Sequence, residues 1–467
     1  MVHGKEYKMA EMQEFDVIVI GAGLAGGLPA GNYLQKAGAR VLMIDANQEV
    51  GTHCKSNEFF PNAMCTPCAS GYFGGASPMW EDLGLEDYGL KYVLPKRFFG
   101  AFFPDHTNLF IGPVDIEGSV QDIARFSQKD ADKFVEIVGP FMEAYVEMNE
   151  LMFFSPPNPR NLTRMYETMA EIVGLPVDMF ADMNGFELLD VLFEDHRIKQ
   201  VLLQPGVTGI FGDPGQKGQG AFNVLAALFV PSGQLLATNH SKVHALVRCF
   251  LDNGGTLWRN SAVTEIITEN GIAKGVRLSD NAVMHPGETI MAKHAVISNV
   301  GAKLSLDLIG EDTMQLADPL LYTKMKYFDN SSRASSVTIW ALKGQPNWKS
   351  AAHSPYIHKS DFFYKGKNSF DEWKEWYMAE KSGDPEKAFS GWWEMLMPAA
   401  LDPVQTSPEG VVTFRLEEIM PFWWREGDGF PKMERWDDEK WNLVKKREDE
   451  LELYAPGFKD QIVDVLA

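Results

Sequence analysis

The segment FDVIVIGAGLAGGLPAGNYLQKAGARVLMID, residues 15–45, constrains the fold more than any other part of the chain. It begins with a short apolar run rich in β-branched residues, which is typical of a buried parallel strand. The complete pattern G-x-G-x-x-G follows at residues 21–26, and a helical stretch comes next. Residues 40–44 then predict a second strand, which ends before Asp45. This order of elements is typical of a dinucleotide-binding α/β domain.

The glycines of this pattern have separate steric roles. Gly21 permits the tight turn after the strand, Gly23 lets the backbone approach a pyrophosphate, and Gly26 lets the helix pack closely on the strand. The amino-terminus of the helix then faces the phosphate charge. Asp45 lies 24 residues after Gly21 and can accept hydrogen bonds from a ribose diol. The predicted cofactor contacts are therefore Gly21, Ala22, Gly23, Leu24, Ala25, Gly26, Asp45 and Ala46.

The pattern by itself fits either NAD or FAD. Gly27, directly after the third glycine, and the sequence DANQEVGTH at residues 45–53 resemble the flavin-binding version. Many flavoproteins have two adjacent glycines and often an arginine in the last segment, whereas this chain has Gly51, Thr52 and His53. We favour FAD as the cofactor, and we add Gly51 and Thr52 to the predicted contacts.

Composition limits the remaining classes of function. The chain has 467 residues, more than one hydrophobic core usually serves, so we expect two or three domains. With 64 acidic and 43 basic residues, the net charge is −21, which argues against nucleic acid and against an anionic membrane surface. The first fifteen residues lack the apolar region of a secretory signal, and four cysteines do not make a disulfide framework. We therefore expect a cytoplasmic protein.

Apolar periodicity indicates that the domains are interleaved along the chain. Helical spacing is prominent between residues 78 and 205, a helix followed by strands spans residues 241–300, and alternating, strand-like segments follow. The expected organisation is a first part of the FAD-binding domain at 14–77, a helical part of a substrate domain at 78–205, a second part of the FAD-binding domain at 206–304, substrate-domain sheet and helices at 305–455, and an entry to a further FAD segment at 456–467.

Several motifs occur in an order that resembles one flavoprotein family. They are MWEDLGLEDYGL, LFEDHRIKQVLL, FLDNGGTLWRNSAVTEI, AKHAVISNVG and YAPGFKDQIV. With the amino-terminal glycine pattern, they resemble the phytoene-desaturase-like branch of the FAD-dependent amine-oxidase and desaturase superfamily. The resemblance implies an α/β fold, in which a Rossmann-like FAD-binding domain is interleaved with an α+β substrate domain that contains a mixed or antiparallel sheet and a helical insertion. It also implies a backbone contact from Val263 to the FAD adenine.

Members of this family carry a closing segment with a Thr-Pro-x-Asp stretch and a glycine-rich turn beside the flavin. The sequence YAPGFKDQIVDVLA at residues 454–467 corresponds to the approach to that segment. We therefore expect the flavin site to be completed either by a carboxy-terminal segment beyond the given sequence or by a second polypeptide, and we favour both over the alternative that FAD is bound without such a segment. The protein could accordingly be a homo-oligomer or a hetero-oligomer.

The resemblance implies an FAD-dependent oxidoreductase, a desaturase or dehydrogenase acting on CH–CH or CH–OH groups. It would move a hydride from a small hydrophobic or alicyclic substrate to the flavin, and oxygen, a quinone or a carrier would reoxidise the flavin. The alternative is a non-catalytic binding or escort protein on the same fold, like the GDP-dissociation inhibitors. We identify no Ser-His-Asp arrangement and no histidine pair with metal-binding spacing, so we nominate no catalytic residue and expect no metal site.

Overall fold

The computed structural model describes residues 14–61, 63–66, 77–112, 114–155, 158–207, 213–229, 234–236, 238–328, 334–382, 393–420 and 436–467. Its chain divides into two compact units. Unit 1 comprises Met1–Lys55, Glu81–Leu90 and His240–Asp329, and unit 2 comprises Ser56–Trp80, Lys91–Asn239 and Asn330–Ala467. Both units combine helices with sheets, which confirms the expected α/β fold class with interleaved units.

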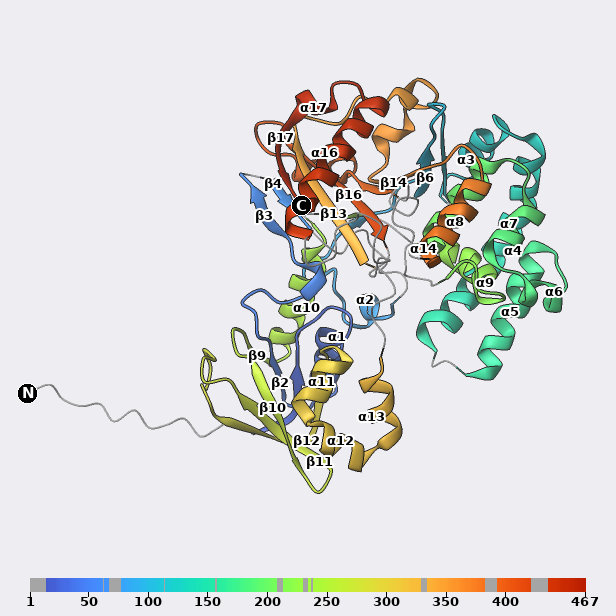
Figure 1. The fold of residues 1–467 in the computed structure, drawn as a ribbon. Coiled ribbons are helices and arrows are strands. Elements are labelled where there is room, and N and C mark those ends of the chain that lie inside the picture. Colours follow the sequence, from blue (N-terminus) through green and yellow to red (C-terminus); the bar gives the residue numbers. More distant parts are fainter. Residues whose placement is uncertain are drawn as a thin grey trace, which may run out of the picture. The chain divides into compact units, whose positions relative to one another are not determined.

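A six-stranded sheet forms the centre of unit 1, with the order β10-β11-β12-β1-β2-β9 (Figure 1). The strands are β1 (Phe15–Ile20), β2 (Val41–Ile44), β9 (Thr256–Trp258), β10 (Val263–Glu269), β11 (Ile272–Leu278) and β12 (Thr289–Ser298). Strand β1 pairs in parallel with β2 and β12, and β2 pairs in parallel with β9. The apolar side chains of β1 and β2 are buried, as the uninterrupted apolar runs predict for parallel strands.

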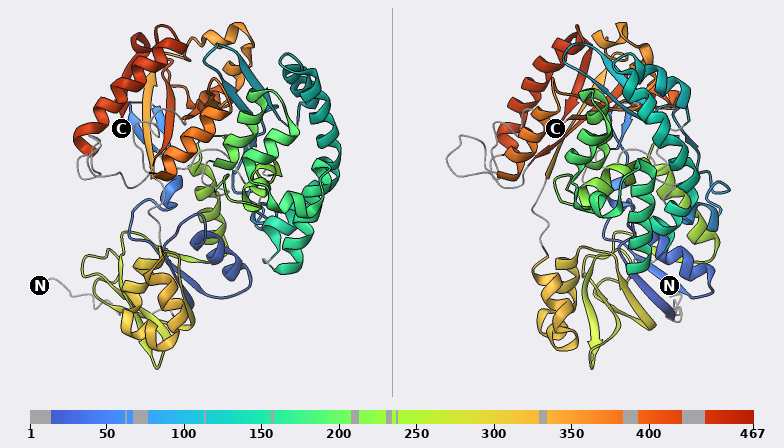
Figure 2. Two further views of the ribbon diagram at one scale, coloured as in Figure 1. Left: turned by 45° about the vertical axis from the view of Figure 1, so that its right-hand side comes forward. Right: turned by 90° about the vertical axis from the view of Figure 1, so that its right-hand side faces the viewer.

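Helices of unit 1 pack on this sheet. Helix α1 (Gly27–Lys36) lies against β1, β2 and α10 (His240–Asp252). Gly31 permits the close packing, because a Cβ atom there would collide with Met43 and leave little room beside Phe250. Helix α11 (Ala302–Ile309) packs on β10 and is followed by α12 (Glu311–Ala317) and α13 (Pro319–Lys326) (Figure 2).

Unit 2 is built on a seven-stranded sheet with the order β17-β13-β16-β15-β14-β6-β7. The strands are β6 (Phe99–Phe102), β7 (Asn108–Ile111), β13 (Ala334–Leu342), β14 (Phe362–Lys365), β15 (Trp393–Leu396), β16 (Val412–Met420) and β17 (Ile462–Leu466). Neighbouring strands pair antiparallel, except that β14 and β6 pair in parallel. Helix α16 (Trp436–Tyr454) runs alongside this sheet and buries Val444 and Leu451 against a core that contains Trp340 and Phe414 (Figure 2).

A second core of unit 2 lies among its helices. These are α3 (Ile116–Ala124), α4 (Gln128–Asn149), α5 (Pro159–Val173), α6 (Val177–Asp182), α7 (Gly185–Leu192), α8 (His196–Val207), α9 (Gln219–Ala226) and α14 (Asp371–Ser382). Shorter elements are α2 (Met79–Asp82), α17 (Phe458–Gln461), β3 (Asn57–Phe60), β4 (Ala63–Cys65), β5 (Tyr92–Val93) and β8 (Gln234–Leu235). The helical periodicity of residues 78–205 therefore corresponds to helices that share one apolar core.

The boundaries of the units differ from the expected domain boundaries at four places. Residues 56–77 and 206–239, expected in the FAD-binding domain, belong to unit 2, whereas residues 81–90 and 305–329, expected in the substrate domain, belong to unit 1. Helix α9 packs on α7 and α8, and α13 packs on α11 and α12. Each segment therefore belongs to the unit that contains the helices on which it packs. Within residues 456–467, the apolar tail forms β17, which pairs with β13 of unit 2.

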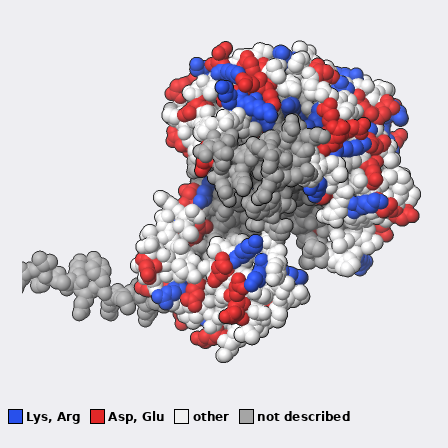
Figure 3. All heavy atoms as spheres, viewed as in Figure 1, with Lys and Arg blue, Asp and Glu red and all other residues white. Residues whose placement is uncertain are grey.

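Charge is distributed without a strong local excess of one sign on the face shown in Figure 3. Acidic and basic side chains lie interspersed over the described residues of that face. None of the helices that the structure describes is both long and apolar enough to cross a membrane.

A buried carboxyl group makes the stability of unit 2 depend on pH. Burial raises the pKa of Asp361 from 3.8 to about 7, and within the described chain Oδ1 has no hydrogen-bond partner. Between these pH values the folded protein binds a proton that the unfolded chain has released, so the free energy of unfolding falls as the pH rises. This difference corresponds to an upper bound of about 4 kcal/mol.

We expect Asp361→Asn to remove this dependence and to stabilise the protein more at pH 8 than at pH 5, because the amide remains neutral. Urea unfolding at both pH values measures the effect. The matched control is Asp371→Asn, whose parent carboxylate is 83% exposed in the same unit. Equal effects of the two substitutions at pH 8 would contradict the assignment.

Candidate dinucleotide site

The carboxyl ends of β1, β2 and β12 meet at one edge of the unit 1 sheet, where open α/β sheets bind ligands. A cavity of about 550 Å³ lies there. It collects most of the cofactor-binding residues predicted from the sequence. Those that line it are Gly21, Gly23, Leu24, Ala25, Asp45, Ala46, Gly51, Thr52 and Val263.

The two remaining predicted residues lie behind the cavity wall. Ala22 is fully buried, and its N–H group donates to Oδ2 of Asp45 at 2.9 Å. Gly26 precedes the first turn of α1, and a Cβ atom there would overlap the side-chain oxygen of Asn299. The closest approach of helix to strand is instead at Gly27, where a Cβ atom would overlap the Gly21 carbonyl oxygen. The packing role predicted for Gly26 therefore belongs mainly to Gly27.

Asp45 is held in place by backbone donors. Besides the bond from Ala22, its Oδ1 accepts hydrogen bonds from Asn47 N at 2.8 Å and Asn47 Nδ2 at 3.1 Å. A carboxylate has about four acceptor sites, so Oδ2 retains one for a further donor. Asp45 is only 6% exposed but lines the cavity, which leaves the side chain fixed and available to a hydroxyl group there.

The turn between β1 and α1 presents unused donors. Leu24 and Ala25 line the cavity, and within the part of the chain that the structure describes their N–H groups have no acceptor. They lie directly before α1, where the helix dipole adds positive potential. Such donors suit an anionic group.

The loop after β2 places two consecutive residues in the left-handed region. Gly51 has φ +100° and Thr52 has φ +49°. Gly51 N donates to the Ala22 carbonyl at 3.0 Å, and a Cβ atom on Gly51 would collide with Val243. Glycine adopts this conformation without strain, whereas a β-branched threonine rarely does.

Several polar residues of the cavity wall were not predicted, among them Asn47, His53, Ser261 and Asn299. Asn299 follows β12, its N–H group donates to the Ile20 carbonyl at 2.8 Å, and its side chain approaches the Gly21 carbonyl. Ser261 N donates to the Asp45 carbonyl at 3.0 Å. The strand before Asn299 was recognised, and its parallel pairing with β1 is the signal that places Asn299 beside the glycine turn.

Unit 2 contains a separate, apolar cavity of about 50 Å³. Aromatic and aliphatic side chains from strands and helices line it, including Phe99, Ile111, Phe134, Phe141 and Leu225. A cavity of this chemistry suits a hydrocarbon group better than a polar one.

The expectation that the sequence holds no histidine pair with metal-binding spacing was wrong. His240 and His244 lie four residues apart in α10, and Glu49 from the loop after β2 meets both rings. The spacing His-x-x-x-His in a predicted helix was the signal that could have found them.

A parallel sheet with a glycine turn and an acidic residue at its edge is the fold of a dinucleotide-binding α/β domain. Residues 19–83 match the family described as NAD(P)-binding Rossmann-like domain. The crystal structure of an oxidoreductase from Methanosarcina mazei superimposes with a TM-score of 0.58 at 13% identity, over 96% of this chain and 87% of that chain. That likeness shows the fold.

Two proteins of known name are similar to this chain in sequence. A limonene dehydrogenase subunit from Castellaniella defragrans is 25% identical over 443 residues, which are 90% of this chain and 76% of the relative. Hydroxyneurosporene desaturase from Cereibacter sphaeroides is 25% identical over 363 residues, which are 74% of this chain and 66% of the relative. These matches confirm the resemblance to the FAD-dependent desaturase and oxidase family, and they support an oxidoreductase in general terms.

Proposed function

We propose that this chain is an FAD-dependent dehydrogenase or desaturase that moves a hydride from a hydrophobic or alicyclic substrate to the flavin. The observation that carries the proposal is the 550 Å³ cavity. Its wall contains both the unused N–H groups of Leu24 and Ala25 and the fixed carboxylate of Asp45. When bound, FAD supplies the hydride acceptor, and the protein supplies binding and orientation. The substrate bond would be a CH–CH or CH–OH group, and oxygen, a quinone or a carrier would reoxidise the flavin.

The residues of the cavity fit the polar groups of FAD. The N–H groups of Leu24 and Ala25 would donate to the pyrophosphate, and Asp45 Oδ2 would accept from a ribose hydroxyl. Val263 lies at the start of β10 and lines the same cavity, so its backbone would contact the adenine.

The substrate class is supported by one of the sequence comparisons. One similar protein is named for limonene, which is alicyclic, and that protein is one subunit of its enzyme. We therefore propose an alicyclic or similarly apolar substrate and a second polypeptide as partner, in a cytoplasmic assembly.

An ultraviolet–visible spectrum of the natively purified protein, with intact mass on the same sample, tests the proposed function. We expect flavin bands in the natively assembled protein, and the mass measurement reports any additional polypeptide. A colourless, fully assembled protein would contradict the oxidoreductase proposal and favour the escort-protein alternative.

The variant Asp45→Asn tests the placement of the cofactor. A hydrogen bond to a charged group contributes about 1.5–3 kcal/mol, so we expect FAD to bind apoprotein roughly 10- to 150-fold more weakly. Fluorescence titration measures this change. Glu265→Ala, at an exposed position of β10 in the same unit, is the control and should leave affinity unchanged. If Asp45→Asn binds as tightly as the control, Asp45 does not contact the ribose.

A further inference from the structure

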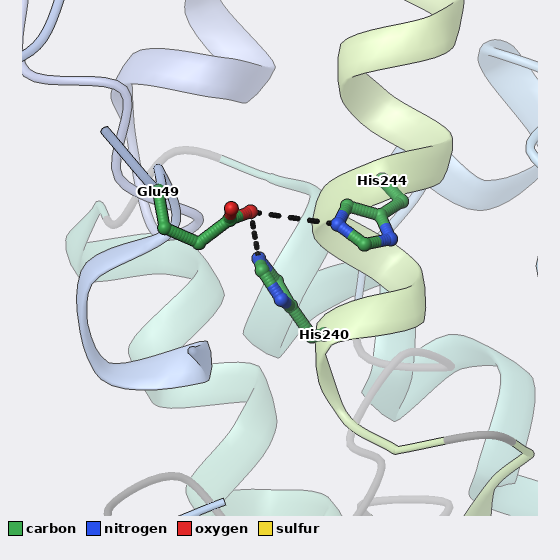
Figure 4. A group of neighbouring side chains, drawn as sticks. All are labelled: Glu49, His240 and His244. Atoms are coloured by element: carbon green, nitrogen blue, oxygen red, sulfur yellow. Dashed lines mark ion pairs between the residues drawn. The ribbon is translucent and has the colours of Figure 1, made fainter. Parts of the chain in front are cut away.

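Three potential metal ligands converge next to the dinucleotide cavity without taking part in its lining. They are Glu49, from the loop after β2, and His240 and His244, from the first turns of α10 (Figure 4). Residues four positions apart lie on the same face of an α-helix. Both imidazole rings accordingly turn towards the carboxylate of Glu49 in Figure 4.

The distances between the ligand atoms match a tetrahedral metal centre. Glu49 Oε1 lies 3.1 Å from His240 Nε2 and 3.5 Å from His244 Nε2, and all three ligand atoms lie within 4.8 Å of one another. Metal–ligand bonds of about 2.0–2.1 Å in tetrahedral zinc sites place ligand atoms roughly 3.3–3.4 Å apart. The two separations from Glu49 Oε1 already have this value to within a few tenths of an ångström.

Burial and charge at the cluster also suit a metal ion. His240 is 5% exposed, which holds its ring in a fixed position beside Glu49. Glu49 and His244 are about half exposed, which gives an ion access from solvent. The ring centroids of the two histidines are 4.3 Å apart. A bound cation would be coordinated by both rings and by the carboxylate at the same time.

The competing explanation is an ordinary hydrogen-bonded pair. His240 Nε2 also lies 3.2 Å from the Val50 carbonyl oxygen, so its proton has an acceptor without any metal. That pair does not require His244, whose Nε2 is directed at the same carboxylate oxygen. The convergence of two rings on one oxygen distinguishes the cluster from a simple pair.

We propose that Glu49, His240 and His244 form a binding site for a divalent transition-metal ion of the zinc type, with two nitrogen ligands and one carboxylate ligand. The fourth position is left to water or to the Val50 carbonyl. Each ring would bind the metal through Nε2, which requires the single proton of the neutral ring to lie on Nδ1, so a proton on Nε2 first moves to Nδ1 by exchange with water. A bound metal ion would link the loop after β2, through Glu49, to α10.

This metal site would stabilise one wall of the dinucleotide cavity. Asp45 and Asn47 precede Glu49 in the loop, Gly51 and Thr52 follow it, and all four residues line the cavity. A metal-mediated link between Glu49 and α10 would therefore restrict the motion of the loop after β2, which includes the cavity-lining carboxylate of Asp45. The proposed metal site does not depend on the identity of the dinucleotide or on the proposed reaction.

Calorimetric titration of the native, chelator-treated protein with Zn²⁺ at neutral pH tests the proposal, together with thermal unfolding with and without Zn²⁺. We expect one equivalent to bind and to raise the unfolding temperature. His244→Ala and Glu49→Gln should each weaken binding by more than the roughly 10- to 100-fold cost of losing an outer-shell partner. Both parent side chains are about half exposed, so the variants should fold.

The matched control is His285→Ala. His285 Nδ1 lies 3.0 Å from Glu288 Oε2 in the same unit, and among the described residues no third metal ligand joins this histidine–carboxylate pair. This variant should bind Zn²⁺ like the parent. Absence of stoichiometric binding by the folded parent, or unchanged binding by His244→Ala and Glu49→Gln, would overturn the proposal. Tetrahedral d–d bands of bound Co²⁺, lost in His244→Ala, would give independent support.

Discussion

Gly27→Ala should remove the dinucleotide site. A Cβ atom at this position would overlap the Gly21 carbonyl oxygen, which is backbone and cannot turn aside. Helix α1 would have to move away from β1, and the unused N–H donors of the turn would move with it. We expect destabilisation of about 1–3 kcal/mol and loss of most bound flavin. Flavin absorbance per protein and chemical unfolding measure the two effects.

Gly139→Ala is the control for the glycine substitution. Gly139 lies at an exposed position of α4, outside the lining of the dinucleotide cavity, and a Cβ atom there would meet no heavy atom within 4 Å. The control should not lower stability, because alanine favours a helix interior over glycine by about 1 kcal/mol, and it should leave flavin binding unchanged. A Gly27→Ala protein that keeps its flavin and its stability would show that α1 does not need this close contact.

Arg447→Met should strongly destabilise unit 2. The guanidinium group is fully buried and contacts Glu418 Oε1 at 2.6 Å, and it also reaches Glu450 at 2.9 Å. The side chain of Glu418 is only 4% exposed, so removal of the arginine would leave a buried, uncompensated carboxylate. We expect a loss of about 3–5 kcal/mol in the free energy of unfolding, measured by urea denaturation.

The double variant Arg447→Met/Glu418→Leu tests whether the loss of stability comes from the charge that the single variant leaves buried on Glu418. Removing both charges leaves no buried ion, so much of the lost stability should return. Arg164→Met serves as the surface control, because its ion pair with Glu147 is nearly half exposed and should contribute about 1 kcal/mol or less. A single variant as stable as this control would contradict the role assigned to Arg447.

The parts of the fold that were predictable are those that local sequence determines. The β1–α1–β2 unit follows from uninterrupted apolar runs, a glycine turn and a helical period, all within residues 15–45. The same local pattern predicted Asp45 and the glycines of the cavity wall as cofactor contacts. These features need no knowledge of distant contacts.

Apart from the His240–His244 spacing, which the sequence itself contains, the parts that were missed depend on contacts between distant segments. Asn299 reaches the cavity only because β12 pairs in parallel with β1, a pairing that joins residues almost 280 positions apart. The boundary expected at residue 206 lies at residue 239 in the structure, because α9 packs on α7 and α8 of unit 2. Gly27 was assigned no packing role because the steric limit is set by the exact approach of α1 to the Gly21 carbonyl.

The parallel pairing of β6 with β14 has a consequence for biosynthesis. Strand β6 comprises residues 99–102, and its partner β14 comprises residues 362–365. Strand β6 therefore cannot pair with β14 until the ribosome has synthesised about 260 further residues. The unit 1 sheet imposes a similar delay, since β1 needs β12 before its second edge is covered. Neither unit can complete its sheet on a short nascent chain, and the exposed strand edges in the interval are surfaces that chaperones recognise and that aggregation exploits.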